Sequence, residues 1–326
     1  MELAADRLRD LLGRMRGRRI AVVGDAILDR YLIGDSERLS PEAPVPVVTV
    51  SERRASPGGA ANVAANLAAL GAVPLLVGVV GDDFDGALLR QVARDAGFGA
   101  DGLLSINRRP TTVKTRVIAR GQQVVRIDEE DAGALEPADA GRLLGAARAA
   151  IEHADAVILE DYNKGVLTPA TIPELIAAAR ARRIPVVVDP RYHHFFAYAG
   201  ATVFKPNRRE LATALGPGVD LGSAVALHHA VARLGVEHLL LTLGGEGMVL
   251  VGADGRSDRI PARAREVFDV SGAGDTVAAW CAAALGAGAS VLEASMVANL
   301  AAGVEVGKAG VATVAPEEVL AIHRTP

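Results

Sequence analysis

Short apolar runs and longer amphipathic stretches alternate along most of the chain. Runs typical of buried strands occur at residues 20–24, 73–80, 156–159, 184–188, 203–204 and 239–242. Between them, apolar positions at helical spacing predict helices at residues 59–70, 83–96, 168–182, 277–285 and 292–306. This alternation predicts an α/β fold, with a mostly parallel sheet covered by helices on both faces.

Two stretches break this alternation. Residues 31–50 contain three prolines followed by an apolar run, and residues 111–128 alternate around a turn at residues 120–123, which predicts a hairpin. Both are expected to be antiparallel strands that form a small lid over the strand ends, where open α/β sheets bind ligands. The alternation places Lys114 and Arg116 on one face. They either grip a phosphate or protect an edge strand by their charge.

Composition narrows the class of protein. The chain has 326 residues, and half of them are hydrophobic, which is enough for a large core. The net charge is −4, so there is no sign of the basic face that binding of nucleic acid needs. Residues 1–19 predict an amphipathic helix rather than a signal peptide, and no apolar run is long and uncharged enough to cross a membrane. Cys281 is the only cysteine and is expected to fill the core. We expect one domain over residues 1–326, with both lid segments inserted.

The strongest chemical signal is the run Asp269-Val-Ser-Gly-Ala-Gly-Asp-Thr276, which directly precedes a predicted helix. Glycines allow backbone N–H groups to approach a ligand closely, and a helix start favours an anion. Asp275 could be a simple helix cap, but capping accounts for only one of the acids. The run therefore predicts a phosphoryl site beside a carboxylate that takes the proton of an attacking hydroxyl.

This run resembles the C-terminal signature of the ribokinase-like (PfkB) carbohydrate kinases, and residues 58–71 resemble the N-terminal signature of that family. The likeness runs in order from about Arg19 to Thr313. It implies a Rossmann-like core with a β lid, and the use of ATP and Mg²⁺ to phosphorylate a sugar hydroxyl. It further implies that Asp275 is the catalytic base, with an anion hole made by the amides of Gly272, Ala273 and Gly274. A monovalent cation site, for K⁺ in some members, would involve Asp269 and Ser271, completed by Gly310 and the carbonyl of Glu305.

The same resemblance assigns residues to the nucleotide. Residues 207–210 follow a strand end and by themselves fit a capping box. They also resemble the family's Asn-x-x-Glu motif, which implies that Asn207 and Glu210 act on Mg²⁺ through water while Lys205 reaches the phosphates. The remaining ATP positions implied by the resemblance are Thr242, Gly244, Gly247, Asn299 and Gly303. Residues 241–248 alone would predict only a hairpin, and Asn299 could equally be a polar residue on a helix face.

Three segments point to a substrate. Residues 24–31, 38–47 and 114–128, together with residues 161–165, resemble the family branch that phosphorylates D-glycero-β-D-manno-heptose 7-phosphate. This implies transfer to the anomeric 1-hydroxyl, giving heptose 1,7-bisphosphate for ADP-heptose and lipopolysaccharide precursors. The substrate contacts implied are Asp29, Gly58, Gly59, Asn62, Lys114, Arg116 and Asp161. The alternatives are a kinase of another sugar or sugar phosphate and a non-catalytic sugar-binding regulator.

The resemblance also carries expectations about partners. We expect a cytoplasmic enzyme with a phosphorylated sugar substrate and no contact with nucleic acid or membrane. Exposed lid strands favour a homodimer that pairs through the lid. We expect no nucleotidyltransferase domain in this chain, so a separate nucleotidyltransferase would act on the product.

Overall fold

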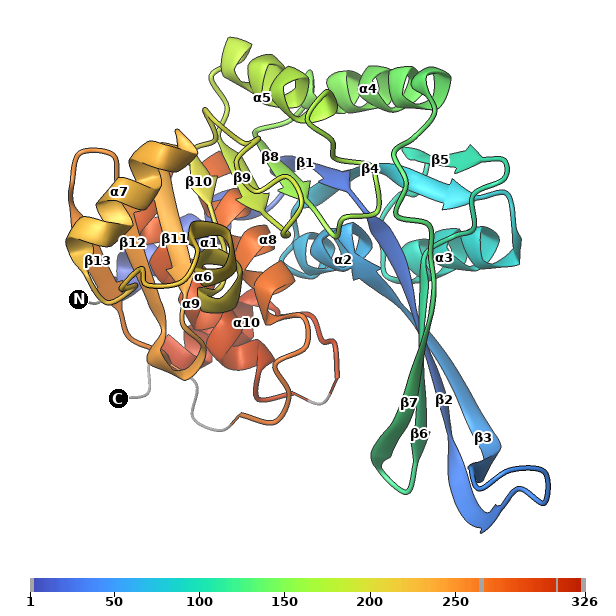
Figure 1. The fold of residues 1–326 in the computed structure, drawn as a ribbon. Helices are drawn as coiled ribbons and strands as arrows, with labels where there is room; N and C mark the ends of the chain where they lie inside the picture. Colours follow the sequence, from blue (N-terminus) through green and yellow to red (C-terminus); the bar gives the residue numbers. More distant parts are fainter. Residues whose placement is uncertain (1–2, 264–266, 309, 324–326) are drawn as a thin grey trace.

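The main sheet has nine strands within the part of the chain that the computed structural model describes, residues 3–263, 267–308 and 310–323. The strand order is β13-β12-β11-β10-β9-β8-β1-β4-β5 (Figure 1). All neighbours are parallel except β11–β12 and β12–β13. In chain order the strands are β1 (Arg19–Gly24), β4 (Val73–Gly81), β5 (Leu103–Ile106), β8 (Ala156–Glu160), β9 (Val186–Asp189), β10 (Val203–Phe204), β11 (His238–Thr242), β12 (Met248–Gly252) and β13 (Ser257–Ile260).

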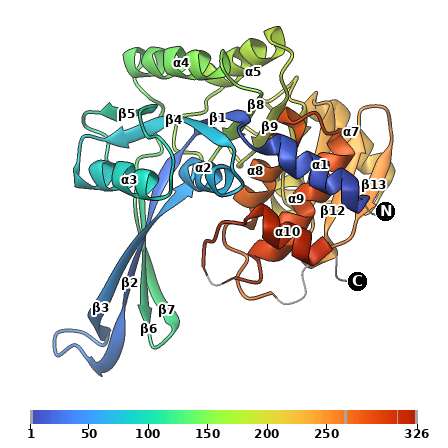
Figure 2. The ribbon, with the colours of Figure 1, turned by 180° about the vertical axis from the view of Figure 1, so that it is seen from behind.

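Helices cover both faces of the sheet, and each layer encloses its own apolar core (Figures 1 and 2). One face carries α1 (Ala5–Met15), α2 (Ala60–Ala69), α3 (Phe84–Asp95), α8 (Ala273–Gly286), α9 (Val291–Glu305) and α10 (Pro316–His323). The other face carries α4 (Pro137–Ile151), α5 (Thr171–Ala181), α6 (Arg208–Leu215) and α7 (Ala224–Leu234). The predicted α/β layering is confirmed.

The core is built from small aliphatic residues, as the low aromatic content indicates. Cys281 is fully buried on α8 beside Trp280, and burial raises the pKa of its thiol to about 12. This confirms it as a core residue, because a thiol that stays protonated is a poor nucleophile. Leu8, Leu11 and Met15 are buried on α1, which confirms the amphipathic N-terminal helix. Among the described residues, every helix is too short or too polar to cross a membrane.

A second, four-stranded sheet projects away from the body (Figures 1 and 2). Its order is β3-β2-β6-β7, with β2 (Ala26–Leu39), β3 (Pro46–Gly59), β6 (Val113–Ala119) and β7 (Gln122–Glu129). The β6–β7 hairpin turns at Arg120 and Gly121, with φ of 53° and 74°, as a two-residue primed turn requires. Strands β2 and β3 extend beyond residues 31–50 at both ends, so β3 leads directly into α2.

Candidate active site

The site lies where four parallel strands end. Asp25 follows β1, Glu160 ends β8, Asp189 ends β9, and Lys205 follows β10. The start of α8 faces this edge, because its Gly274 lies against two of these side chains: a Cβ on Gly274 would be 3.4 Å from both Asp189 Oδ2 and Lys205 Nζ. The strand ends and the helix start therefore form one polar site, at the edge where open α/β sheets bind ligands.

Asp275 lies in the first turn of α8 and is held on both carboxylate oxygens. Asn62 Nδ2 donates to Oδ2 at 2.7 Å, and the Tyr162 hydroxyl donates to Oδ1 at 2.9 Å. Only 5% of the Asp275 surface is exposed. Burial raises its pKa to about 6, against the lowering effect of the two hydrogen bonds. A carboxylate that is fixed in position and titrates near neutral pH fits the requirements of a general base.

Three carboxylates meet beside Lys205. Oxygens of Glu160, Asp189 and Asp275 all lie within 4.8 Å of one another. Lys205 Nζ is 2.8 Å from Asp189 Oδ2, and both oxygens of buried Glu160 are without a hydrogen-bond partner among the described residues. Burial and the neighbouring carboxylates raise the pKa of Glu160 well above its usual range. This oxygen-rich group fits a hard divalent cation such as Mg²⁺.

The glycine loop before α8 is built to approach an anion. Gly272 is the helix N-cap with φ of 93°, a backbone conformation that favours glycine. Of the three amides predicted to form the anion hole, that of Ala273 makes a long 3.4 Å contact to the Val270 carbonyl. The space next to Gly274 is bounded by Lys205, so an anion bound there would meet both a helix N-terminus and a buried cation.

A cavity of about 620 Å³ opens between the lid base and α8. Asp29, Lys114 and Arg116 line it from the lid strands, and Arg116 is paired with Asp29. Gly58 fits tightly behind Asp29, since a Cβ there would be 2.4 Å from Asp29 Oδ2. The lining also includes Gly59, Ser271, Gly272 and Asp275. The structure thus brings most of the sequence-predicted sugar and base residues to one cavity.

Asp161 is placed elsewhere. It is 1% exposed, accepts from the Tyr198 hydroxyl at 2.7 Å and from the Asn163 amide at 2.7 Å, and does not line the cavity. Its neighbour Tyr162 lines the cavity instead. Sequence reasoning did not single out Tyr162 or Asp25 as site residues. Their one signal is position, because Asp25 directly follows β1 and Tyr162 is the second residue after β8.

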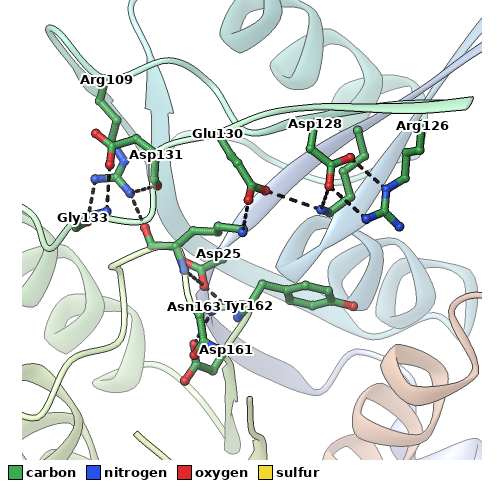
Figure 3. A network of polar contacts seen from close by, with 12 residues as sticks. Asp25, Arg109, Arg126, Asp128, Glu130, Asp131, Gly133, Asp161, Tyr162 and Asn163 are labelled. Carbon is green, nitrogen blue, oxygen red and sulfur yellow. Dashed lines mark hydrogen bonds and ion pairs between the residues drawn. The ribbon is translucent and has the colours of Figure 1, made fainter. Parts of the chain in front are cut away.

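Asp25 organises the loop that carries Tyr162. Its buried carboxylate accepts the backbone N–H groups of Tyr162, Lys164 and Val166 at 2.7, 3.0 and 3.4 Å. Burial, with the nearby Asp161, raises the pKa of Asp25 to about 6. Figure 3 shows this carboxylate beside the Tyr162 backbone, with the Tyr162 ring directed away from it. The loop is therefore fixed by its backbone, which leaves its side chains to face the cavity.

The Asn207–Glu210 motif forms a capping box at the start of α6. Asn207 Oδ1 accepts from the Glu210 amide and Glu210 Oε2 accepts from the Asn207 amide, both at 2.8 Å. Glu210 Oε1 also accepts from Arg191 at 2.9 Å, and the Arg191 guanidinium lies 4.4 Å over the Tyr162 ring. The capping interpretation is confirmed. Glu210 is linked through Arg191 to the tyrosine that holds Asp275.

The predicted nucleotide positions lie on separate elements. Thr242 ends β11, and Gly244 and Gly247 bracket a 3-10 turn over Gly244–Glu246. Asn299 and Gly303 lie on α9, where Asn299 Nδ2 donates to the Pro261 carbonyl at 2.8 Å. Asn299 is thus engaged with the segment after β13.

The predicted monovalent-cation residues lie at the end of α9 and in two segments, one before α8 and one after α9, which meet near Gly272. The Phe268 and Asp269 amides donate to the Val306 carbonyl at 2.7 and 3.2 Å, which ties the loop before α8 to the end of α9. A Cβ on Gly272 would be 3.3 Å from Glu305 Oε1 and 3.3 Å from Val311. Burial, with repulsion from Asp269 and Asp275, raises the pKa of the Glu305 side chain to about 8. Ser271 lies in the segment before α8, and Gly310 lies in the segment after α9.

Comparison with known proteins identifies the family. The family model described as pfkB family carbohydrate kinase matches residues 18–318. The bifunctional protein HldE of Rhodospirillum rubrum is 46% identical over 322 residues, covering 97% of this chain and 64% of that protein. The protein of the same name from Azorhizobium caulinodans is 49% identical over 311 residues, covering 94% of this chain and 64% of its own length. The chain thus spans less than two thirds of the length of these relatives.

Solved structures agree on the fold. Arabidopsis thaliana ribokinase, complexed with ribose and ATP, matches with a TM-score of 0.74 at 22% identity, covering 95% of this chain and 100% of that chain. Phosphofructokinase-2 from Escherichia coli, in complex with potassium, matches with a TM-score of 0.75 at 19% identity, covering 94% and 98%. The ribokinase-like fold is confirmed. The family model and these relatives, read with the two glycine signatures, show that the chain belongs to the pfkB family of carbohydrate kinases.

Proposed function

We propose that the chain is an ATP-dependent kinase that phosphorylates the anomeric 1-hydroxyl of D-glycero-β-D-manno-heptose 7-phosphate, giving heptose 1,7-bisphosphate. The observation that carries the proposal is the position of Asp275, which borders the sugar cavity and also adjoins the glycine loop and Lys205. A base between a hydroxyl site and an anion site is the arrangement needed for in-line phosphoryl transfer.

In this mechanism Asp275 orients the sugar hydroxyl and takes its proton. Asn62 and Tyr162 hold the carboxylate so that it does not turn away from the hydroxyl. The amides of Gly272, Ala273 and Gly274 and the ammonium of Lys205 stabilise charge on the migrating phosphoryl group. A Mg²⁺ ion bound with ATP would neutralise phosphate charge, held by Glu160 and Asp189 directly or by Asn207 and Glu210 through water. General base catalysis contributes roughly 10²–10⁴-fold in rate.

We propose that ATP binds at the end of β11 and beside α9. We propose that Thr242, Gly244 and Gly247 contact ATP, and that Asn299 and Gly303 shape the adenine pocket. We propose that K⁺ binds near Asp269, Ser271, Glu305 and Gly310 and holds the glycine loop in place. Burial, with repulsion from Asp269 and Asp275, disfavours the charged form of Glu305, and a cation bound beside it would offset that repulsion.

The choice of a phosphorylated substrate rests on the basic cavity wall and on the resemblance of residues 38–47 and 114–128 to heptose 7-phosphate kinases. Lys114, Arg116, Arg126, Lys164 and Arg191 all line the cavity. A neutral sugar has no need of so many cations. The likeness to proteins named bifunctional protein HldE supports the same choice.

The test is release of ADP with a panel of sugars. We expect heptose 7-phosphate to give kcat/KM at least 100-fold above free heptose, ribose and fructose, since these sugars lack the phosphate and losing several charge-assisted hydrogen bonds costs more than about 3 kcal/mol. Equal turnover of fructose 6-phosphate would favour a kinase of another sugar phosphate. Strong turnover of ribose or fructose with none of heptose 7-phosphate would overturn the substrate. ATP consumption by no sugar at all would favour the sugar-binding regulator.

We further propose that the enzyme acts in the cytoplasm as a homodimer paired through the lid, and that a nucleotidyltransferase consumes the product. The lid exposes Val124, Val125 and Ile127 on β7, with Leu39 and Val45 near the β2–β3 turn. Exposed apolar strands of this kind favour pairing with a second copy. Light scattering should give twice the monomer mass of 33.7 kDa. A monomeric mass that persists at high protein concentration would contradict the dimer.

A further inference from the structure

Two lysines of the sugar cavity share one carboxylate. Lys164 Nζ lies 2.7 Å from Glu130 Oε1, and Lys114 Nζ lies 3.5 Å from Glu130 Oε2. Lys114 also lies 3.2 Å from Asp128 Oδ2, and Arg126 binds both oxygens of Asp128 at 2.9 and 3.0 Å. Figure 3 shows Glu130 reaching down from the segment after β7, with Asp128 and Arg126 beside it. The charged ends of these five side chains, three cations and two carboxylates, therefore meet at one place beside the cavity.

The backbone around Lys164 is fixed from several sides. Its N–H donates to Asp25 at 3.0 Å, and its carbonyl accepts from Arg109. Arg109 also donates to the carbonyls of Asp131 and Gly133, at 2.6 and 3.0 Å, which ties the segment after β7 to the same loop. Gly165 packs directly on that segment, since a Cβ there would be 2.0 Å from the Gly133 carbonyl. Glu130 and Lys164 thus extend from two rigidly joined backbones.

The side chains are sheltered more than surface ion pairs usually are. Lys114 and Lys164 are 16% and 15% exposed, and Glu130 is 28% exposed. Their cations face a cavity rather than bulk water. A carboxylate that bridges two ammonium groups occupies the place where two oxygens of a phosphate could bind the same pair, with a third oxygen left for a further contact.

We propose that Lys114 and Lys164 form the subsite for the phosphate that the sugar substrate already carries, and that Glu130 is a placeholder which the phosphate displaces. This rests on the proposed function, and it names the cations that make the site specific for a phosphorylated sugar. Glu130 keeps the lysines ordered before substrate arrives and turns to solvent when the phosphate binds. A neutral sugar brings no anion to displace Glu130, so the subsite contributes nothing to its binding.

The experiment compares binding of heptose 7-phosphate and of unphosphorylated heptose by calorimetry, using the full chain. The variants are Lys164→Met and Glu130→Gln, singly and combined. Arg148→Met and Glu174→Gln are the matched controls, because that exposed ion pair joins α4 and α5, outside the cavity lining. Lys164→Arg tests rescue by a conservative change, and thermal melting checks that each variant folds.

Loss of a charge-assisted contact predicts roughly 10–100-fold weaker binding of the phosphorylated sugar in Lys164→Met, with less than about two-fold change for free heptose. Glu130→Gln is expected to tighten binding of the phosphorylated sugar about three-fold or more, since the competing anion is weakened. In the Lys164→Met background Glu130→Gln should give no such gain. Lys164→Arg should restore most of the affinity, and both controls should match the parent.

Equal weakening of both sugars by Lys164→Met would overturn the subsite, as would weaker binding in Glu130→Gln. If Lys164→Met does not fold, the Glu130→Gln result decides. Failure of the proposed function gives a different pattern. If the parent binds another phosphorylated sugar instead of the heptose, the variants are measured with that sugar, and the same comparison judges the subsite. If the parent binds only unphosphorylated sugars, the subsite is wrong.

Discussion

At the scale of single residues, the important feature is how Asp275 is held. Each of its oxygens accepts one hydrogen bond, from buried Asn62 or from Tyr162 of the cavity lining, and the remaining lone pairs are left for a substrate hydroxyl. Asn62 is itself placed by the second asparagine of its helix, since Asn66 Nδ2 donates to the Asn62 carbonyl at 3.1 Å. Asn66 Oδ1 accepts from Thr276 on α8 at 3.2 Å. The two signature segments are therefore joined by a buried polar chain beside the base.

The Tyr162 hydroxyl is predicted to set the pH range of the reaction. Because the base must be ionised and its pKa is about 6, kcat/KM should fall as the pH drops through about 6. Tyr162→Phe removes a donor that lowers this pKa. The acid limb should then move up by about one pH unit, from a hydrogen bond worth about 1.5 kcal/mol and about 1.4 kcal/mol per pKa unit. The measurement is kcat/KM against pH for both proteins.

Tyr198→Phe is the control for this profile. It also removes the hydroxyl of a buried tyrosine that donates to a carboxylate, but the acceptor is Asp161, which lies outside the cavity lining. It should cost stability and leave the acid limb in place. If Tyr162→Phe also leaves the limb unmoved, Tyr162 does not tune the base.

The sequence was informative about Asp275 and less so about the loop after β8. Asp275 is fixed by a glycine run and a helix start, which are local features. Asp161 and Tyr162 are neighbours, and which of them faces the cavity depends on the backbone of this loop, which Asp25 holds from far away in the chain. A single sequence does not encode that choice locally. The expectation that Asp161 contacts the sugar therefore stays a prediction, and the geometry favours Tyr162.

At the scale of elements, the close fit of β3 against β2 places the sugar-facing carboxylate. A Cβ on Gly58 would lie 2.4 Å from Asp29 Oδ2 and 3.0 Å from Asp29 Cγ, so Gly58→Ala must displace the Asp29 carboxylate and disturb its pairing with Arg116. We predict a rise in KM for the sugar of roughly ten-fold or more, from the disturbed charge-assisted pair, with little change in KM for ATP. Steady-state kinetics with each substrate varied in turn measures both values.

Gly145→Ala is the matched control. Gly145 lies on α4, where a Cβ meets nothing within 4 Å, so alanine should raise stability by about 0.5–1 kcal/mol and leave both KM values unchanged. A sugar KM that is the same in Gly58→Ala and in the parent would show that the Asp29 position does not matter for binding.

Element prediction succeeded where the pattern was strong. The parallel strands other than β5, and the helices α2, α3, α5 and α9, lie close to the predicted ranges, because buried apolar runs and capped amphipathic stretches are local signals. Strand β5 was not predicted. Helix α4 was not predicted, since only Leu143, Ala147 and Ile151 are buried along its 15 residues. The full length of the lid strands was also missed. Most residues of β2 and β3 lie in the projecting sheet and are partly or fully exposed, so a simple hydrophobic alternation is absent.

At the scale of the whole molecule, the residues of the proposed site come from two sheets. The main sheet with α8 carries the base, the glycine loop and the buried Lys205, and the lid sheet carries Asp29, Lys114 and Arg116. Both contribute to the lining of one cavity of about 620 Å³. In the proposed reaction, movement of the lid against the body would close the sugar site and exclude water, which would otherwise take the phosphoryl group.

The central claim is that Asp275 directs phosphoryl transfer to the anomeric hydroxyl of an already phosphorylated heptose. The most direct measurement is ³¹P and ¹H NMR of the product formed from D-glycero-β-D-manno-heptose 7-phosphate, ATP and Mg²⁺, for the parent and for Asp275→Asn. We predict a second phosphate resonance coupled to the anomeric proton, one ADP for each product, and no product from Asp275→Asn although ATP still binds. A phosphate at another carbon, or near-normal turnover by Asp275→Asn, would contradict the account.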